Sequence, residues 1–317
     1  MNEPLLPDPA GVDVSKDTLQ LHLRGRQHLL ANTPAGYAQL LQLVQAGGAV
    51  QLICEATGGY EQGLVAACHA AGQLISVVNP ARVRHFALAQ GQRAKNDPID
   101  ASVLTAYGQA LRPAPTVLAD PAQQEIRALV TWRDHLQADL IRARQTLEHG
   151  VPAFVGRQQK KLVAHLEKQL AAVDAALTAA LARAPQLQAQ VQALAQLDGV
   201  GVRTALHVLS GMPELGTVGR QEATALAGLA PWVRQSGRWQ GQRHIGGGRA
   251  PVRRALYMPA VVLARMPRTK LGQCYAHLRA EGKPAKVALT AVMRKLLLQM
   301  NRVLKELAAP QPVPTIA

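Results

Sequence analysis

Apolar and polar residues alternate near the start of the chain, as they do in β-strands that bury one face. The runs Gly11–Lys16 and Leu19–Leu23 both follow this two-residue period, and Lys16 and Asp17 lie between the two alternating stretches. Alternation of this kind is the signature of a half-buried strand, and a short polar break between two such runs is typical of a turn. The pattern therefore predicts a β-hairpin.

Helical and strand patterns then alternate over the next hundred residues. Helical spacing of apolar residues appears at 35–46, at 60–72 and from residue 80 onward, whereas 50–54 and 74–78 are short apolar runs of strand length. Strands that alternate with helices indicate a sheet covered by helices on its faces. We therefore predict an α/β domain over residues 1–113.

A longer helical repeat replaces this alternation in the middle of the chain. Two runs of apolar residues keep spacings compatible with a heptad, and Gly150 and Pro152 lie between them, where the chain can reverse,. The first run is Ile126, Leu129, Leu136, Leu140, Ala143 and Leu147, and the second is Val163, Leu166, Leu170, Val173, Leu177 and Ala180. We predict an antiparallel coiled-coil hairpin over residues 114–185 that serves spacing or association, with an ordinary pair of core helices as the alternative.

Basic residues are concentrated in the C-terminal part, which the pattern predicts to be mainly helical over residues 186–317. The whole chain of 317 residues carries 35 Lys and Arg against 20 Asp and Glu, and residues 191–317 alone hold 18 against 5. A local excess of this size favours a polyanionic partner, with nucleic acid as the leading candidate. The alternative is a basic surface that only confers solubility.

Composition excludes several other classes of protein. The apolar stretches fall short of the ~18 residues that a membrane span requires, and the N-terminus carries Glu3 where a signal peptide has Lys or Arg,. The three cysteines have no CxxC spacing, which argues against a disulfide framework and a thiolate zinc site,. We therefore expect a cytoplasmic, nucleoid-associated protein that has no membrane partner.

Four acidic residues lie at positions where a site is expected. Asp13 falls within a predicted strand, where a carboxylate is costly unless it is compensated, and Glu55 ends the next apolar strand, at the edge where open α/β sheets hold ligands,. Asp97 and Asp100 are three residues apart at the start of a predicted helix, on neighbouring positions of one face,. Helix capping is the alternative for this pair, because Pro98 is a favoured first helical residue.

These four carboxylates, if they converge at one edge of the sheet, form a site for a hard divalent cation. Mg²⁺ suits such a site because it is bound by a few carboxylates together with water and substrate phosphate. Two such ions ~4 Å apart can stabilise the attacking and leaving oxygens in phosphodiester cleavage.

Two segments of the C-terminal part are candidates for phosphate binding. The run Leu197–Arg203 contains Gly199 and Gly201 before a helix, where exposed backbone N–H groups bind phosphate; a plain helix C-cap followed by a new helix is the alternative,. The second segment, residues 234–254, places seven Arg or His residues around Ser236. The candidate contacts are Gly199, Gly201, Arg203, Arg234, Arg238, Arg243, Arg249, Arg253 and Arg254.

Ser236 has two possible roles in this arginine-rich loop. Neighbouring guanidinium groups favour an alkoxide and stabilise charge that develops at phosphorus, so the serine is a candidate nucleophile. The alternative is a hydroxyl that only hydrogen-bonds phosphate.

Taken together, these motifs resemble the DEDD-type transposases of insertion sequence family 110, in the right order along nearly the whole chain. The resemblance is carried by Gly11–Lys16, Glu55–Gly58, Asp97–Ala101, Gly228–Pro231, Ser236–Gly237, Ile245–Arg249 and Val252–Met258. It implies an N-terminal RuvC-like domain with the RNase H fold, a coiled-coil stalk and a C-terminal transposase domain that carries a serine.

The same resemblance implies a mechanism. Asp13, Glu55, Asp97 and Asp100 would form the acidic tetrad that binds Mg²⁺, and Ser236 would be the nucleophile that becomes covalently joined to DNA. Members of this family are guided by a bridge RNA, a structured noncoding RNA from the element that pairs with donor and target DNA. A homo-oligomer, either a dimer or a tetramer, is expected.

Three functions therefore compete. The leading one is a transposase or site-specific DNA recombinase that cuts and rejoins strands. The second is a metal-dependent, structure-specific RuvC-like nuclease in which water attacks and Ser236 only contacts phosphate. The third is a non-catalytic protein that binds DNA or RNA.

Overall fold

The computed structural model describes residues 8–46, 48, 50–92, 97–117, 120–232, 235–236, 239–241 and 243–309. By its internal contacts the chain divides into two compact units, residues 1–119 and 120–317. Each unit is described by itself. The division into three domains, with the helical hairpin as a part of its own, remains a prediction.

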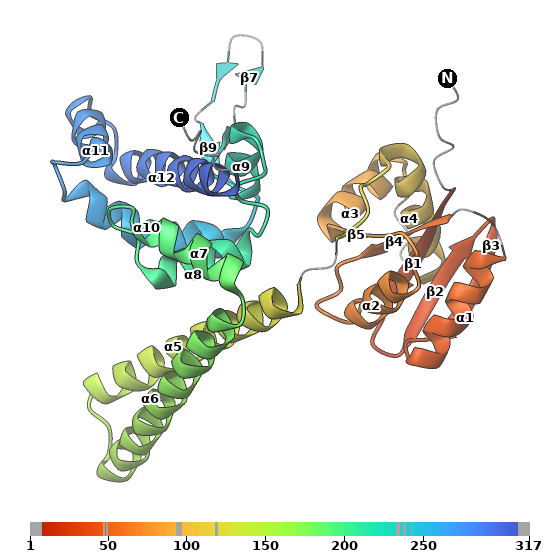
Figure 1. Ribbon diagram of the computed structural model, residues 1–317, viewed down its shortest axis with the longest axis horizontal. Coiled ribbons are helices and arrows are strands. Elements are labelled where there is room, and N and C mark those ends of the chain that lie inside the picture. The colour runs from red at the N-terminus through yellow and green to blue at the C-terminus, as the bar shows by residue number, and fades with distance from the viewer. Residues whose placement is uncertain are drawn as a thin grey trace, which may run out of the picture. The chain divides into compact units, whose positions relative to one another are not determined.

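A five-stranded mixed sheet forms the centre of the first unit (Figure 1). Its strands are β1 (Asp8–Val14), β2 (Thr18–Leu23), β3 (Arg26–Ala31), β4 (Val50–Glu55) and β5 (Ile75–Val78), in the order β3-β2-β1-β4-β5. The first three strands are antiparallel, and β4 and β5 run parallel to β1. The predicted hairpin is thereby confirmed. Strand β3 was not predicted, because it is an edge strand without a buried side chain and so lacks a clear apolar alternation,.

Helices cover both faces of this sheet. The helices α1 (Pro34–Gln45) and α2 (Gln62–Ala70) lie on one face, where they share a core with Val12, Leu52 and Cys54. On the other face lie α3 (Pro80–Ala89) and α4 (Asp97–Leu111) (Figure 1). They share a second core, in which Ile53 of β4 contacts residues such as Tyr107 of α4. The α/β architecture expected of the N-terminal part is therefore confirmed.

Helix α4 lies in direct contact with the sheet because two glycines remove the side chains that would separate them. A Cβ atom at Gly11 of β1 would overlap the Ala101 carbonyl oxygen, and one at Gly108 of α4 would lie 2.8 Å from the Ile53 side chain. The buried Thr105 hydroxyl accepts a hydrogen bond of 2.8 Å from the Gly11 N–H group. These contacts fix the height of α4 above β1 and β4.

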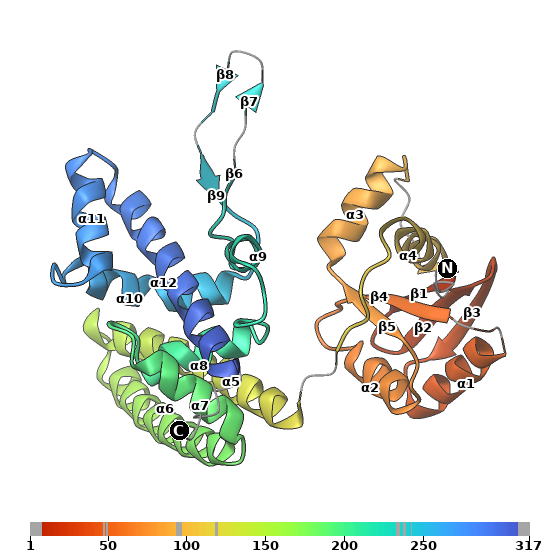
Figure 2. The ribbon, with the colours of Figure 1, turned by 45° about the horizontal axis from the view of Figure 1, so that its top comes forward.

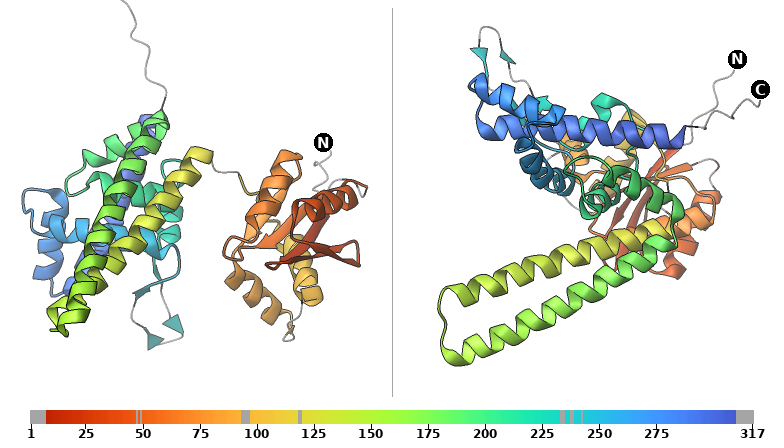
Figure 3. Two further views of the ribbon diagram at one scale, coloured as in Figure 1. Left: turned by 90° about the horizontal axis from the view of Figure 1, so that it is seen from below. Right: turned by 60° about the vertical axis from the view of Figure 1, so that its left-hand side comes forward.

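The second unit is helical. Its first two helices, α5 (Pro121–Glu148) and α6 (Ala153–Ala182), run side by side in opposite directions (Figure 3). The described residues form six further helices: α7 (Pro185–Ala195), α8 (Val202–Gly211), α9 (Arg220–Leu226), α10 (Ala250–Ala264), α11 (Lys270–Ala280) and α12 (Ala285–Ala308). One hydrophobic core extends from the paired helices into this group. No helix within the described residues combines the length and the apolar character that crossing a lipid bilayer requires.

A narrow β-ribbon projects between α9 and α10. Its base pairs β6 (Pro231–Trp232) with β9 (His244–Ile245), and its outer part pairs β7 (Gln235–Ser236) with β8 (Trp239–Gln240) (Figure 2). From the sequence we predicted a loop for this segment. The strands are only two residues long, which is too short for an alternating pattern to show.

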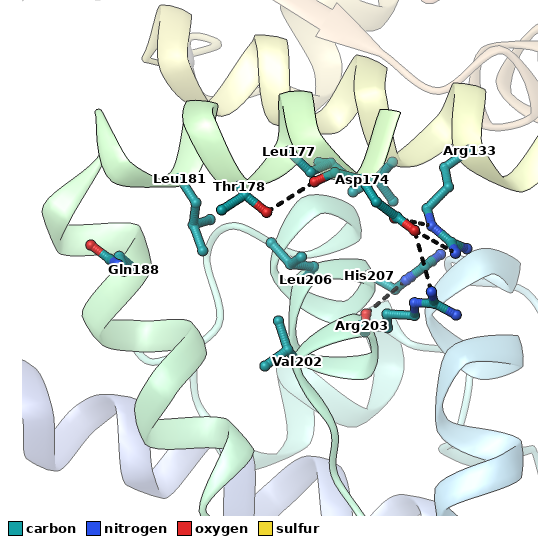
Figure 4. Close-up of a pocket in the computed structure, with 11 residues that line it drawn as sticks. Arg133, Asp174, Leu177, Thr178, Leu181, Gln188, Val202, Arg203, Leu206 and His207 are labelled. Carbon is teal, nitrogen blue, oxygen red and sulfur yellow. Dashed lines mark hydrogen bonds and ion pairs between the residues drawn. The ribbon is translucent and has the colours of Figure 1, made fainter. Parts of the chain in front are cut away.

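The apolar positions predicted for the two paired helices are mostly buried, with one interruption in α5, whereas the coiled coil itself remains a prediction. In α6 five of the six predicted positions are buried and Val163 is partly buried, whereas in α5 the gap between Leu129 and Leu136 is filled by Arg133, which is itself buried. Its Nε donates to Asp174 of α6 over 2.6 Å (Figure 4). Arg203 of α8 also pairs with Asp174, at 3.4 Å, and His207 pairs with Asp134 of α5, at 2.7 Å. Polar and charged side chains therefore join the hairpin to α8.

Two of the three cysteines are buried, and burial keeps their thiols protonated. Cys54 and Cys68 are buried in the first unit, as expected of small apolar side chains, whereas Cys274 is only partly buried. Burial raises the pKa of the Cys54 thiol, and it raises the pKa of Cys68 to about 12. Both remain neutral thiols at neutral pH, which agrees with a structural role.

Replacing Asp174 should destabilise the second unit. Asp174→Asn leaves the Arg133 guanidinium, which is only 7% exposed, without its counter-charge. Because Asp174 itself is 42% exposed and partly screened by water, we expect a loss of about 1–3 kcal/mol, between the values typical of an exposed pair and of a fully buried pair,. The measurement is urea unfolding at neutral pH. The control is Asp139→Asn, which removes an exposed ion pair with Arg142 on α5 and should cost under about 1 kcal/mol,.

The same pair predicts a dependence on pH. The hydrogen bond from Arg133, followed by its charge and that of Arg203, lowers the pKa of the Asp174 carboxyl below its ordinary value of 3.8. A lowered pKa in the folded state stabilises the protein fully above the ordinary value, and this contribution is lost as pH falls through the lowered value. The stability difference between wild type and Asp174→Asn should therefore shrink in strong acid. A difference that grows in acid would contradict this assignment.

Candidate active site and nucleic-acid interface

Two of the predicted acids lie side by side on neighbouring strands. In the parallel pairing of β1 with β4, Val12 is opposite Cys54, and Asp13 and Glu55 each follow one residue later. Since Gly11 and Ile53 face α4, the alternation of side chains turns Asp13 and Glu55 toward the same face,. The register of the sheet therefore brings these two carboxylates together from positions 42 residues apart.

Helix α4 adds a third carboxylate. Asp97 and Asp100 both lie in its first turn, where negative charge is favoured by the helix dipole,. Asp100 lines a pocket of about 230 Å³ together with Asp13 and Glu55, and α3 contributes Arg84 to the same pocket. Asp97 is exposed and does not line it. Three of the four predicted acids are thus brought together.

The carboxylate oxygens of this pocket are suitable ligands for a hard cation, but the side chains do not converge closely enough to form a metal-binding group. Carboxylate oxygens are the ligands that Mg²⁺ prefers. Among the residues that the structure describes, however, no group of three or more His, Cys, Asp or Glu side chains is arranged to hold a metal ion.

A fifth acid, Glu61, orders the loop that follows Glu55. Its carboxylate accepts hydrogen bonds from the Thr57 and Gly59 backbone N–H groups, at 3.1 and 2.9 Å, and from the Thr57 hydroxyl, at 3.0 Å. Burial opposes its charge, but these hydrogen bonds prevail and lower the pKa of Glu61 below the ordinary value. Glu61 therefore orders the backbone between β4 and α2, a role that no local pattern in the sequence predicted.

The predicted glycine turn links α7 to α8. Gly199 has a positive φ of 73°, and Gly201 is the N-cap residue of α8. Gly201 and Arg203 are exposed, and the Arg203 guanidinium pairs with the Asp174 carboxylate. The turn separates two helices and leaves the N-terminus of α8 exposed, and its contact with phosphate remains a prediction.

Ser236 and the arginines predicted at residues 234–254 belong to the segment of the ribbon and the start of α10. Arg234 and Arg238 lie outside the described residues. Arg243 and Arg254 are exposed. The backbone of Ser236 lies in β7, opposite Trp239. Ser236 and the arginines belong to the second unit, whereas the carboxylate pocket belongs to the first.

Arg249 and Arg253 make structural bonds at the base of the ribbon. Arg249 pairs with Glu214 at 2.6 Å and donates to the Gly211 carbonyl at 2.9 Å. Arg253 donates to the carbonyl oxygens of Ala227 and Gly247. Their proposed contacts with nucleic acid remain predictions, but each guanidinium already helps to hold the ribbon in place.

Close backbone packing accounts for two glycines at the same base. Gly228 and Gly248 both have positive φ angles, of 66° and 57°, and a Cβ atom at either would overlap backbone of the other segment. Trp232 donates from its indole N–H to the Gly246 carbonyl at 3.3 Å. Gly228 and Gly248 are therefore required by the close approach of the two segments.

The sequence matches two family models. One, described as a transposase of the DEDD IS110 type, matches residues 10–152, and the other, described as the transposase IS116/IS110/IS902 family, matches residues 191–276. The chain belongs to the IS110 family of transposases. The first match includes all four predicted acids, and the second includes Ser236 and the basic ribbon.

Two relatives of this transposase carry a functional name. They are the pilin gene-inverting proteins of Moraxella bovis and Moraxella lacunata, each 27% identical over 307 residues, which cover 93% of this chain and 95% of each relative.

Membership of the family establishes the class of activity. The protein is a DNA transposase or recombinase, so that its substrate is DNA. DEDD transposases depend in general on divalent metal ions. The non-catalytic alternative is therefore excluded.

Replacing Gly228 tests the packing at the base of the ribbon. Gly228→Ala introduces a Cβ atom against the Gly247 carbonyl and forces a positive φ on alanine. We expect a loss of about 1–3 kcal/mol, seen as a lower midpoint of thermal unfolding. The matched control is Gly246→Ala, since a Cβ atom there meets nothing within 4 Å. Equal midpoints for the two variants would contradict the steric explanation.

Proposed function

We propose that this transposase cuts and rejoins donor and target DNA with a Mg²⁺-binding acidic tetrad and a serine nucleophile, guided by a bridge RNA. The observation that carries the proposal is the pocket that Asp13, Glu55 and Asp100 share, although they come from three separate segments of the chain. The mixed sheet that holds two of these acids supports a RuvC-like fold for the first unit.

Asp13, Glu55 and Asp100 would hold the metal, and Asp97 would join them from the same helical turn. The two carboxylates of this turn are three residues apart, so they occupy neighbouring positions on the helix surface,. A bound divalent ion supplies Lewis-acid stabilisation of the charge that develops on phosphate oxygens.

Ser236 would supply the nucleophile. Its hydroxyl oxygen attacks phosphorus of the DNA backbone and gives up its proton to solvent, while the bond from phosphorus to one deoxyribose oxygen breaks. That oxygen takes up a proton and leaves as a hydroxyl group, and the other strand end stays joined to the serine. Attack of a strand hydroxyl on this phosphoserine ester then rejoins DNA and regenerates the serine. Exposed Arg243 and Arg254 support the proposal, because guanidinium groups stabilise charge on a phosphoryl group,.

Rejoining, rather than cleavage alone, is supported by the relatives. Their name attributes the inversion of a pilin gene to them. Inversion of a DNA segment requires the cut strands to be joined again. This favours a recombinase over the competing nuclease, in which water attacks and Ser236 only binds phosphate.

The guide and the assembly state belong to the same proposal. The bridge RNA is inferred from the family, and the excess of 18 basic over 5 acidic residues in 191–317 is compatible with binding RNA as well as DNA,. A homo-oligomer, dimer or tetramer, would bring together enough copies to cut both donor and target.

Replacing a pocket carboxylate tests the metal site. Asp13→Asn should lower Mg²⁺-dependent cleavage of element-end DNA by at least about 100-fold, because even outer-shell partners of a metal cost 10–100-fold when replaced. Cleavage is followed on denaturing gels across a Mg²⁺ titration. The control is Asp17→Asn, the same change on an exposed residue four positions away. A cleavage rate that Asp13→Asn leaves unchanged would remove the tetrad from the mechanism.

Replacing the serine separates the two enzymatic hypotheses. Wild type should form a covalent protein–DNA species on a denaturing gel, and Ser236→Ala should form none while it still binds DNA. Ser210→Ala, at a partly buried serine of α8, is the control and should form the species normally. If wild type forms no covalent species and Ser236→Ala still nicks DNA, the protein is a nuclease of the competing kind.

A further inference from the structure

The C-terminal helix of the second unit carries cations that neither the motifs nor the proposed chemistry uses. Arg294, Leu298, Arg302 and Lys305 follow one another at helical spacing, so they share one face of α12 over about 16 Å,. The apolar positions of the same helix, among them Leu297 and Met300, are buried in the core. The amphipathic character of α12 therefore leaves a basic face outward.

Two neighbouring segments turn this face into a groove. Helix α12 contacts both α9 and α11 (Figure 1). Two adjoining hollows of about 560 and 690 Å³ lie along these contacts and share Arg220 and Leu298. Their basic lining residues are Arg220, Lys270, Arg294, Lys295, Arg302 and Lys305.

Buried polar contacts hold one wall of the groove. Asn301 of α12 is only 3% exposed; its side-chain oxygen accepts from the Gly216 N–H group at 2.8 Å, and its amide donates to the Val218 carbonyl at 3.1 Å. Gly216 has a φ of 101°, and a Cβ atom there would lie 2.8 Å from that of Leu304. The segment before α9 is thus fixed against α12, and Arg220 is held beside the cations of that helix.

The charge of the groove is only partly compensated. Of the residues that line the two hollows, six are Lys or Arg and one, Glu222, is acidic. Arg302 pairs with Glu306 at 2.7 Å, but both side chains are largely exposed, and such pairs exchange readily with a stronger partner,. A groove lined in this way attracts a polyanion.

We propose that this groove, which we call the α12 groove, binds the phosphate backbone of duplex DNA without reading its sequence. DNA is the substrate of the enzyme, and Lys and Arg side chains spread over about 16 Å match the spacing of successive backbone phosphates better than that of a single small anion,. The groove is separate from the arginine-rich ribbon, since it is built on α9, α11 and α12. The proposal rests on the family's activity on DNA and not on the tetrad or the serine.

The test removes three lysines of the groove. The full-length triple variant Lys270→Gln, Lys295→Gln and Lys305→Gln is compared with wild type for binding to a short mixed-sequence duplex DNA in EDTA, where no chemistry occurs. Each phosphate contact contributes about 0.9 to the slope of log affinity against log salt concentration. We expect the slope of the triple variant to be shallower than that of wild type by up to about 2.7, because three phosphate contacts are lost. The midpoint of thermal unfolding should be unchanged.

The control removes the same charge elsewhere. The triple variant Lys160→Gln, Lys161→Gln and Lys168→Gln changes three exposed lysines of α6, and its slope should equal that of wild type. Equal slopes for wild type and the groove variant would overturn the proposal, and so would an equal fall in the control or a fall seen with RNA but not with duplex DNA. Because binding is measured without metal, a protein that fails to recombine can still show the expected change in slope.

Discussion

The close approach of α4 to β1 is the constraint on which the acidic pocket depends. Any side chain at Gly11 would collide with the Ala101 carbonyl, and Thr105 ties the helix to the strand by a hydrogen bond of 2.8 Å. Asp13 lies two residues beyond Gly11 on the strand, and Asp100 directly precedes Ala101 on the helix. The contact that seats the helix therefore also places Asp100 beside Asp13, so that both side chains line the same pocket.

The second unit uses charged residues for two different purposes. Arg133, Arg249 and Arg253 are engaged by carboxylates or backbone carbonyls, and they join helices or hold the base of the ribbon. The side chains of Lys295, Arg302 and Lys305 on α12, and those of Arg243 and Arg254, are exposed to solvent instead. The number of basic residues therefore overstates the positive charge available to nucleic acid, because some arginines are bonded to carboxylates or carbonyl groups within the protein.

The candidate site could be predicted only in part, for reasons that particular residues make clear. Asp13 and Glu55 were found because a carboxylate within or directly after an apolar strand is conspicuous in the sequence. The capping pattern of Asp97 and Asp100 could not show which of the two faces the sheet, since that depends on the rotation of α4. Arg133 was missed because it occupies an apolar position of the heptad, and its partner Asp174 is 41 residues away. No local pattern in the sequence indicated that Arg84 would line the pocket or that Glu61 would order the loop after Glu55.

Local periodicity, local composition and short motifs were enough to predict the alternation of strands and helices, the paired helices, the basic C-terminal part and the family. Three features could be known only from the folded protein: which acids share a pocket, which arginines remain exposed, and that α9, α11 and α12 form a groove. These features depend on strand register, on helix rotation and on contacts between segments far apart in the chain. Such contacts are set by the packing of the whole unit, and no window of sequence contains them.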